Sequence, residues 1–366
     1  MSAALKAVLA NGITVVQGST MQSVLAHRRL IAPGMFAVAV FTLAACGDAL
    51  GPATPTMSNG DVEPGPPSST PVTNANPIAG ASFYVDPSSR ARRTADDWRA
   101  SRPSDAAQMD KIAAQPNAKW FGNWNTDVRG DVASAVDVMA SAGATPVLVA
   151  YNIPLRDCGS YSAGGAANPE GYRKWISDFA AGIGVRKAVV VLEPDALGGM
   201  DCLSATHQST RTELLRYAVD AFRAGGATSV YIDAGNSRWH SPATIAARLM
   251  AAGIEHAAGF SLNVSNFFTT AEESAYGDAI SALVGGKHYL IDTSRNGNGP
   301  TANAQWCNPD GRALGERPTT ATGNPLVDAY LWIKVPGESD GSCNGYPNAG
   351  VWVPEYALGL AQRATY

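Results

Sequence analysis

The chain has 366 residues, 16% of them charged, and it contains 37 glycines and 23 prolines. This length allows one large domain with additional segments, and the glycine and proline content indicates long, structured loops. The formal net charge of −4 argues against a nucleic-acid partner, because proteins of that class cluster lysine and arginine on one face.

The N-terminal region has the pattern of an export signal. Positive residues at 27–29 precede an apolar segment at 30–45, which is too short for a comfortable transmembrane helix. The segment ends in Leu43-Ala44-Ala45-Cys46-Gly47, which resembles the lipobox of bacterial lipoproteins. We assign residues 1–46 to a signal region and expect lipid on Cys46, which would otherwise be an unpaired thiol. An ordinary secretion signal with an incidental cysteine is the alternative.

Residues 47–79 are rich in Pro, Gly, Ser and Thr, so they cannot bury enough apolar surface to fold and are expected to form a disordered linker. A single folded domain is expected over residues 80–366. An anchor followed by a tether predicts an exported bacterial protein, either secreted or held at the cell envelope. Translation begins at Met1 or at Met21, since residues 1–20 add nothing to the signal.

Four cysteines remain when Cys46 is set aside, and an even number in an exported protein predicts two disulfides with three possible pairings. The five histidines are scattered and no Cys-x-x-Cys motif is present. We therefore expect no metal.

Apolar strands and helical segments alternate from about residue 81 onward. This rhythm indicates βαβ units and a parallel sheet, and about 285 residues in one such unit favour a β/α barrel. The predicted strands are residues 144–151, 189–192, 229–233, 288–292 and 331–334, and the predicted helices are 131–142, 172–182, 211–224 and 243–252.

Four of these strands lead into acidic residues, namely Asp157, Glu193 with Asp195, Asp233, and Glu338 with Asp340. The carboxyl ends of parallel strands meet at one mouth of a barrel, and like charges held close together raise the pKa of at least one of them. No nucleophile–histidine pair and no glycine-rich phosphate loop accompanies them. A site made only of carboxylates predicts cleavage of glycosidic bonds. Taken alone, Asp195 could instead cap the next helix.

Two long segments carry a family resemblance. Residues 151–159, followed by 162–165, and residues 190–197 resemble the two signatures of glycoside hydrolase family 6, and three shorter motifs follow in that family's order at 231–235, 306–308 and 334–341. The likeness covers about residues 80–366. It implies a cellulase that inverts configuration at β-1,4-glucosidic bonds, on a distorted, incomplete β/α barrel and without a cofactor.

The resemblance also implies roles for single residues. Asp195 is expected to be the general acid, with Asp157 raising its pKa and supporting a chain of waters, while Asp340 is the proposed base. Tyr151 would lie under the reacting sugar, and Glu193 is expected to orient the site. The expected substrate-binding residues are Trp120, Asp233, Trp239, Asn263, Trp306, Lys334 and Glu338; for these, packing or a salt bridge is the alternative.

The implied disulfides are Cys158–Cys202 and Cys307–Cys343, and the first of them would hold the Asp157 loop close to the Asp195 loop. One departure from the family concerns Ala163, where members often have a serine that helps to hold the catalytic water. Ser162 is adjacent but is expected to point differently. This departure leaves open a β-glucan-binding lipoprotein on the same fold with weak or lost catalysis.

The short stretch after Asp340 and the absence of a long insertion between Trp306 and Lys334 favour an open cleft. We therefore expect a monomeric endoglucanase that acts on soluble or amorphous β-1,4-glucan. A cellobiohydrolase and an enzyme for another β-glucan or a cell-envelope polymer are the alternatives.

Overall fold

The computed structural model describes residues 75–366. The signal region, Cys46 and most of the predicted linker lie outside the described residues. Within residues 75–366, no helix is both long enough and apolar enough to span a membrane. The last residues of the predicted linker belong to the folded domain. Ile78 is buried in the apolar cluster inside the barrel, and Asn76 donates a hydrogen bond to the carbonyl of Asp328.

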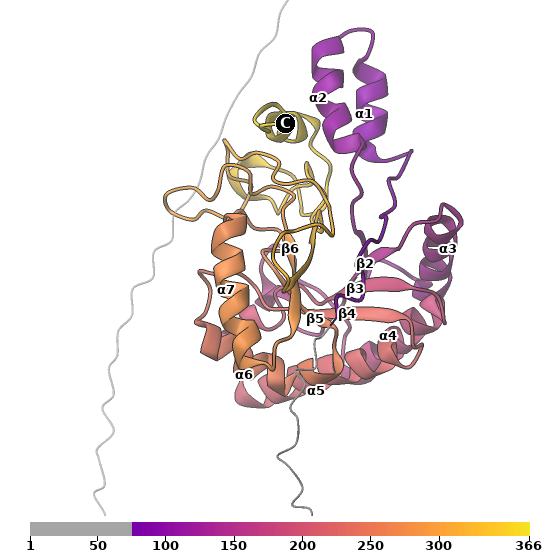
Figure 1. The fold of residues 1–366 in the computed structure, drawn as a ribbon, viewed down its shortest axis with the longest axis vertical. Coiled ribbons are helices and arrows are strands. Elements are labelled where there is room, and N and C mark those ends of the chain that lie inside the picture. Colours follow the sequence, from indigo (N-terminus) through magenta and orange to yellow (C-terminus); the bar gives the residue numbers. More distant parts are fainter. Residues whose placement is uncertain (1–74) are drawn as a thin grey trace, which may run out of the picture. The chain divides into compact units, whose positions relative to one another are not determined.

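Seven parallel strands form one curled sheet in this part of the chain, and each strand pairs with the next one in the sequence (Figure 1). The parallel β/α barrel predicted from the sequence is therefore confirmed, in an incomplete form. The strands are β1 (Lys119–Gly122), β2 (Val147–Tyr151), β3 (Ala188–Leu192), β4 (Thr228–Asp233), β5 (Gly259–Leu262), β6 (His288–Asp292) and β7 (Val327–Leu331).

Helices connect the strands from β1 to β6 and cover the outer face of the sheet (Figure 1). These connecting helices are α3 (Val128–Ser141), α4 (Pro169–Ile183), α5 (Ala205–Arg223), α6 (Pro242–Ala251) and α7 (Thr270–Leu283). Local sequence sets where they begin. Asn168 caps α4, Ser241 caps α6, and Thr269 forms a capping box with Glu272 at the start of α7.

Three further helices lie together at the end of the molecule that bears the C-terminus (Figure 1). They are α1 (Arg90–Trp98), α2 (Pro103–Ala113) and α8 (Pro354–Gln362). Their shared apolar cluster encloses Trp332, the first residue after strand β7. The chain after β7 is thus held by the same cluster that holds the N-terminal helices.

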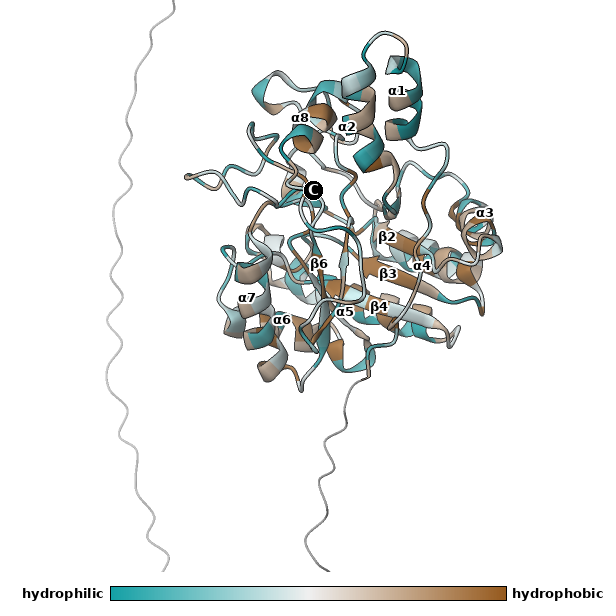
Figure 2. Cartoon of the chain, turned by 45° about the horizontal axis from the view of Figure 1, so that its top comes forward, coloured by the Kyte–Doolittle hydropathy of each residue, from teal (hydrophilic) through white to brown (hydrophobic). Residues whose placement is uncertain are grey.

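Buried side chains form two clusters, one inside the barrel and one between the sheet and its helices, and strand β3 contributes to both. Its residues alternate, so that Val189 and Val191 point into the barrel while Val190 and Leu192 pack against the helices. All four side chains are fully buried. Burial of each stabilises the fold by roughly 1.5–3 kcal/mol relative to exposure. Figure 2 shows hydrophobic residues concentrated on these strands.

The barrel is not closed by strand pairing. No register joins β1 to β7 among the described residues. Instead, Ala118 N–H donates to the carbonyl of Trp332 at 3.0 Å, and the Trp120 indole N–H donates to the carbonyl of Ile333 at 2.8 Å. These bonds link the chain around β1 to the segment that follows β7.

The prediction of a last strand at residues 331–334 was wrong, because β7 ends at Leu331. The sequence pattern did not reveal β7 because the strand contains Asp328, and aspartate is uncommon in strands. Asp328 is tolerated there because it accepts a hydrogen bond from the Tyr231 hydroxyl at 2.6 Å and pairs with His288 Nδ1 at 2.7 Å. Strands β1 and β5 were not predicted.

Candidate active site

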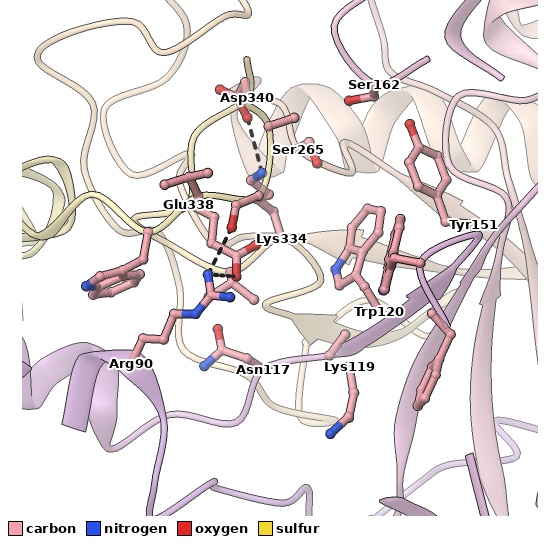
Figure 3. Close-up of a pocket in the computed structure, with 18 of the residues that line it drawn as sticks. Arg90, Asn117, Lys119, Trp120, Tyr151, Ser162, Ser265, Lys334, Glu338 and Asp340 are labelled. Atoms are coloured by element: carbon pink, nitrogen blue, oxygen red, sulfur yellow. Dashed lines mark hydrogen bonds and ion pairs between the residues drawn. The ribbon is translucent and has the colours of Figure 1, made fainter. Parts of the chain in front are cut away.

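A cleft of about 1880 Å³ lies at the carboxyl ends of the strands. It brings together nine of the residues that the sequence singled out, drawn from segments between β1 and the end of the chain: Trp120, Tyr151, Asp157, Asp195, Trp239, Trp306, Lys334, Glu338 and Asp340. Figure 3 shows part of this cleft, with Trp120 and Tyr151 on one wall and Lys334, Glu338 and Asp340 on another.

Asp195 reaches the cleft from the turn that follows β3. Its backbone has a positive φ of 68°, and its N–H donates to Asp233 Oδ1 at 2.9 Å. Burial raises the pKa of Asp195 well above its ordinary value, and the charges of Asp233, Asp157 and Asp340 raise it further. A carboxyl in such surroundings keeps its proton and can act as an acid.

Asp157 lies in a short 3₁₀ helix, η1 (Asp157–Gly159), with a φ of 54°. Its Oδ2 accepts a hydrogen bond from the N–H of Ser162 at 2.7 Å. The disulfide Cys158–Cys202 joins η1 to η2 (Gly198–Cys202), which follows the Asp195 turn. The structure thus pairs Cys158 with Cys202 as the resemblance implied, and it places this bond between the two acidic loops.

Asp340 is held in a different way from Asp195. Its Oδ2 accepts from the buried Arg295 guanidinium at 2.9 Å and from Asn308 N–H at 3.0 Å, while its Oδ1 lies 3.5 Å from Lys334 Nζ.

The Cys307–Cys343 disulfide adjoins Asn308 and η4 (Cys343–Gly345). Arg295 and Asn308 were not predicted from the sequence; the position of Arg295 three residues after a strand ending in Asp292 was the available signal.

Tyr151 is the last residue of β2 and is buried beneath the cleft. Its ring meets Trp120 edge-on, with the ring centroids 5.2 Å apart, and the Arg156 guanidinium lies 4.2 Å from its centroid. Burial is the main cause that raises the pKa of Tyr151, followed by the charge of Asp195. The phenol is therefore neutral throughout the range in which carboxylates titrate.

Two predicted substrate-binding residues do not line the cleft. Asp233 is fully buried and accepts from Asp195 N–H, from Gly235 N–H at 3.0 Å and from the Ser261 hydroxyl at 3.0 Å. Burial raises its pKa to about 7. Asn263 is also fully buried, and its amide bonds the backbone of Phe268 and the carbonyl of Asp292. Both side chains shape loops behind the cleft instead of facing it.

Exposed aromatic rings line the cleft. Trp239 is 40% exposed and Trp306 is 46% exposed, which suits them to stack on flat apolar faces. The Trp239 ring lies against Gly198, where an added Cβ would come within 2.8 Å of it. Trp124, which was not predicted, also lines the cleft and is 54% exposed.

The polar rim contains further predicted residues. Glu338 pairs with Arg90 at 3.1 Å, and burial raises the pKa of Glu338 (Figure 3). Lys334 Nζ donates to the carbonyl of Ser339 at 3.2 Å.

Ser162 and Ala163 both line the cleft, and their carbonyls accept hydrogen bonds from Arg156, at 2.8 and 3.3 Å respectively. Among residues 75–366, no three His, Cys, Asp or Glu side chains are grouped to hold a metal ion.

A curled β/α half-barrel whose strand ends hold clustered carboxylates in a tryptophan-lined cleft defines a glycoside-hydrolase type of site. Comparison with known proteins identifies the family. The model of glycosyl hydrolases family 6 matches residues 78–364, and the chain belongs to that family.

Curated relatives include endoglucanase A of Cellulomonas fimi, 47% identical over 287 residues, and endoglucanase 1 of Streptomyces halstedii, 46% identical over 291 residues. These matches cover 78% and 75% of this chain. The chain spans 62% of the C. fimi protein and 87% of the S. halstedii protein.

Among solved structures, the endoglucanase Cel6 of Mycobacterium tuberculosis, in complex with methyl-cellobiosyl-4-deoxy-4-thio-β-D-cellobioside, is 50% identical, with a TM-score of 0.76. The match covers 79% of this chain and 99% of that one.

Proposed function

We propose that this protein is an endo-β-1,4-glucanase that hydrolyses internal bonds of cellulose or a related β-glucan with inversion of configuration. The observation that carries the proposal is Asp195, a carboxyl at a strand end whose pKa is raised by burial and by three neighbouring carboxylates. The bacterial endoglucanases named above support the choice of an internal cut over release of cellobiose from chain ends.

In the proposed reaction, Asp195 gives its proton to the glycosidic oxygen as the bond from that oxygen to the anomeric carbon breaks. A water attacks the same carbon from the opposite face and loses a proton to a base. One water is consumed, and each turnover leaves Asp195 ionised and the base protonated until protons exchange with solvent. Tyr151, neutral and buried under the cleft, contacts the sugar ring at the point of cleavage.

Asp340 is the base in this proposal. Its Oδ2 is engaged by Arg295 and Asn308, so Oδ1, 3.5 Å from Lys334, is the oxygen left to receive a proton from water. Asp157 contributes its charge and helps to hold the water chain. Trp120, Trp239 and Trp306 stack on sugars, while Lys334 and Glu338 bond sugar hydroxyls. Asp233 and Asn263 act on the substrate only through the loops that they hold.

The test uses carboxymethylcellulose and the full chain. An endoglucanase lowers the viscosity steeply while few reducing ends have appeared, whereas a cellobiohydrolase releases cellobiose with little loss of viscosity. Binding of cello-oligosaccharides without any turnover over long incubation would instead support the binding protein that the Ala163 departure leaves open. A panel with other β-glucans identifies the polymer that is cut fastest.

The cellular place of the enzyme is a separate part of the proposal. We propose that it is exported and anchored by lipid on Cys46, and that it acts as a monomer outside the cytoplasmic membrane. The substitution Cys46→Ser should remove a lipid mass from the mature protein and release it from membranes. Release of an unmodified wild-type protein into the medium would contradict the anchor, and size-exclusion chromatography tests the monomer.

A further inference from the structure

Two buried charged residues that the proposed mechanism does not use lie beneath the loops of Asp157 and Asp195. Glu193, which is 0% exposed, follows strand β3, and Arg211, which is 3% exposed, lies in helix α5. A buried charge is costly unless it is paired and hydrogen-bonded, so the contacts of these two residues show what they stabilise.

The Glu193 carboxylate binds the backbone at the start of the loop that carries Asp157. Both of its carboxylate oxygens lie 2.9 Å from the N–H of Asn152, and Oε2 also accepts from Ile153 N–H at 2.9 Å. Asn152 and Ile153 directly follow β2 and lead into the loop that carries Asp157. Glu193 itself stands two residues before Asp195, with a positive φ of 52°. One side chain therefore joins the two loops at their bases.

Arg211 joins the same loops from the outer side. Its Nη2 donates to the carbonyls of Pro154 at 2.7 Å and Leu155 at 2.9 Å, while Nη1 donates to the carbonyl of Ala196 at 3.2 Å. Pro154 and Leu155 precede Asp157, and Ala196 directly follows Asp195. A planar guanidinium can hold several acceptors in fixed directions, which a lysine cannot do.

The two charges also act on each other. Burial lowers the pKa of Arg211, and the charge of Glu193 opposes that change. Neither Glu193 nor Arg211 lines the cleft. They are positioned to act on the acid's surroundings without touching a substrate.

We propose that Glu193 and Arg211 are positioning residues that together set the separation between Asp157 and Asp195. The inference rests on the proposed function, in which Asp195 is the acid. Weakening either residue lets the two carboxyl groups move apart. Asp157 then raises the pKa of Asp195 less, and the acid loses its proton at a lower pH.

The kinetic test compares Glu193→Gln and Arg211→Lys with wild type. Glutamine keeps the shape of the Glu193 side chain but has one acceptor oxygen in place of two. Lysine keeps the charge of Arg211 but lacks the planar guanidinium with its several donors. We expect kcat to fall by about tenfold or more with KM nearly unchanged, because a small displacement of the acid is costly. The alkaline limb of the kcat profile should move to lower pH by about half a unit to one unit.

Arg186→Lys is the matched control. Arg186 also donates to backbone carbonyls, those of Ile183 at 2.8 Å and Ala133 at 3.3 Å, but it precedes β3 at the opposite end of the sheet. It should lower thermal stability without moving the alkaline limb. An equal shift in Arg186→Lys would show a general structural effect and overturn the proposal. The absence of a shift in both Glu193→Gln and Arg211→Lys would also overturn it.

A second readout does not depend on activity. Hydrogen exchange at the amides of Asn152 and Ile153 should be about tenfold faster or more in the two variants, and unchanged in Arg186→Lys. Unchanged exchange in Glu193→Gln contradicts the role proposed for Glu193. If the wild type hydrolyses no β-1,4-glucan, the proposed function fails, while this exchange measurement still decides whether the two residues hold the loops.

Discussion

Asp233, Asp157 and Asp340 all raise the pKa of Asp195, but they are held in different ways. Asp233 accepts three hydrogen bonds in the protein interior, and Asp340 faces both Arg295 and Lys334. Asp157 lies half-buried at the cleft and is not in an ion pair among the described residues. Removing the Asp157 charge therefore disturbs the surroundings of Asp195, the proposed acid, without leaving a buried cation unpaired.

Asp157→Asn should lower the pKa of Asp195, because one repelling charge is lost. An acid with a lower pKa becomes ionised at lower pH, so the alkaline limb of kcat/KM should move down by about one pH unit. Initial rates on a soluble cello-oligosaccharide across pH measure this shift. Asp178→Asn, at a half-buried position on α4 that is paired with Lys174 and lies outside the cleft, is the control. A limb that stays in place or moves up would show that Asp157 does not act on the acid.

Sequence motifs predicted which residues come to the cleft better than which way each side chain points. Nine of the predicted residues line it, but Asp233 and Asn263 face the interior. A motif fixes order along the chain, whereas the direction of a side chain depends on the loop's backbone, and Asn263 adopts a positive φ of 65°. Trp124 and Arg295 lie outside any repeating pattern, so only the assembled fold reveals them.

At the level of elements, four strands were predicted from their runs of apolar residues, whereas β1 and β5 were missed. Strands β2, β3, β4 and β6 fall within or close to their predicted positions. Strand β5 begins with Gly259, a weak strand former. That glycine is required by packing, since an added Cβ would lie 2.0 Å from the carbonyl oxygen of His288 on β6. A contact between neighbouring strands cannot be read from local propensity.

A second glycine shapes the loop that carries Asp157. Gly165 has a φ of +92°, and an added Cβ would come within 1.9 Å of the carbonyl oxygen of Ile153. We expect Gly165→Ala to destabilise the protein by more than about 2 kcal/mol, since backbone strain and a clash add together. Gly285→Ala is the matched control, because Gly285 has a φ of +77° with nothing within 4 Å of an added Cβ.

The control should cost only about 1–2 kcal/mol, the usual penalty of a left-handed backbone at a residue with a Cβ. Scanning calorimetry of both variants measures the difference. Because the Gly165 loop is also held by Glu193 through Ile153, Gly165→Ala should reduce kcat as well. Equal losses of stability in the two variants would show that the close approach to Ile153 is not required.

For the whole molecule, buried carboxyls set the dependence of stability on pH. Burial raises the pKa of Glu193, Asp233 and Glu273 to about 7. The folded protein therefore binds more protons than the unfolded chain between about pH 4 and pH 7, so stability falls as pH rises through this window. Other carboxyls have a lowered pKa and destabilise the fold only on stronger acidification: Asp110, Glu255 and Glu272.

We expect the melting temperature to be higher at pH 5 than at pH 8. Scanning calorimetry at constant ionic strength measures it. In Glu273→Gln, an amide replaces one of the titrating groups, so the decrease between pH 5 and pH 8 should be smaller than in wild type. A melting temperature that rises steadily from pH 5 to pH 8 would contradict the assignment of these carboxyls.

The sequence also predicted the outline of the whole molecule, since alternating strands and helices with family motifs in order indicate an incomplete parallel barrel. It did not reveal how the gap between β1 and β7 is bridged. That bridge depends on backbone carbonyls of Trp332 and Ile333, which carry no residue-specific signal. The helices α1, α2 and α8 meet only through contacts that are distant in the sequence.

The most direct test of the central claim is the rate at which Asp195→Asn releases reducing ends from carboxymethylcellulose. Asparagine keeps the shape of the side chain but cannot give a proton to the leaving oxygen, and general acid catalysis contributes about 10²–10⁴-fold. We predict a loss of that size, with binding of cello-oligosaccharides retained and with Asp178→Asn as active as wild type. Wild-type rates in Asp195→Asn would contradict the assignment of Asp195 as the acid.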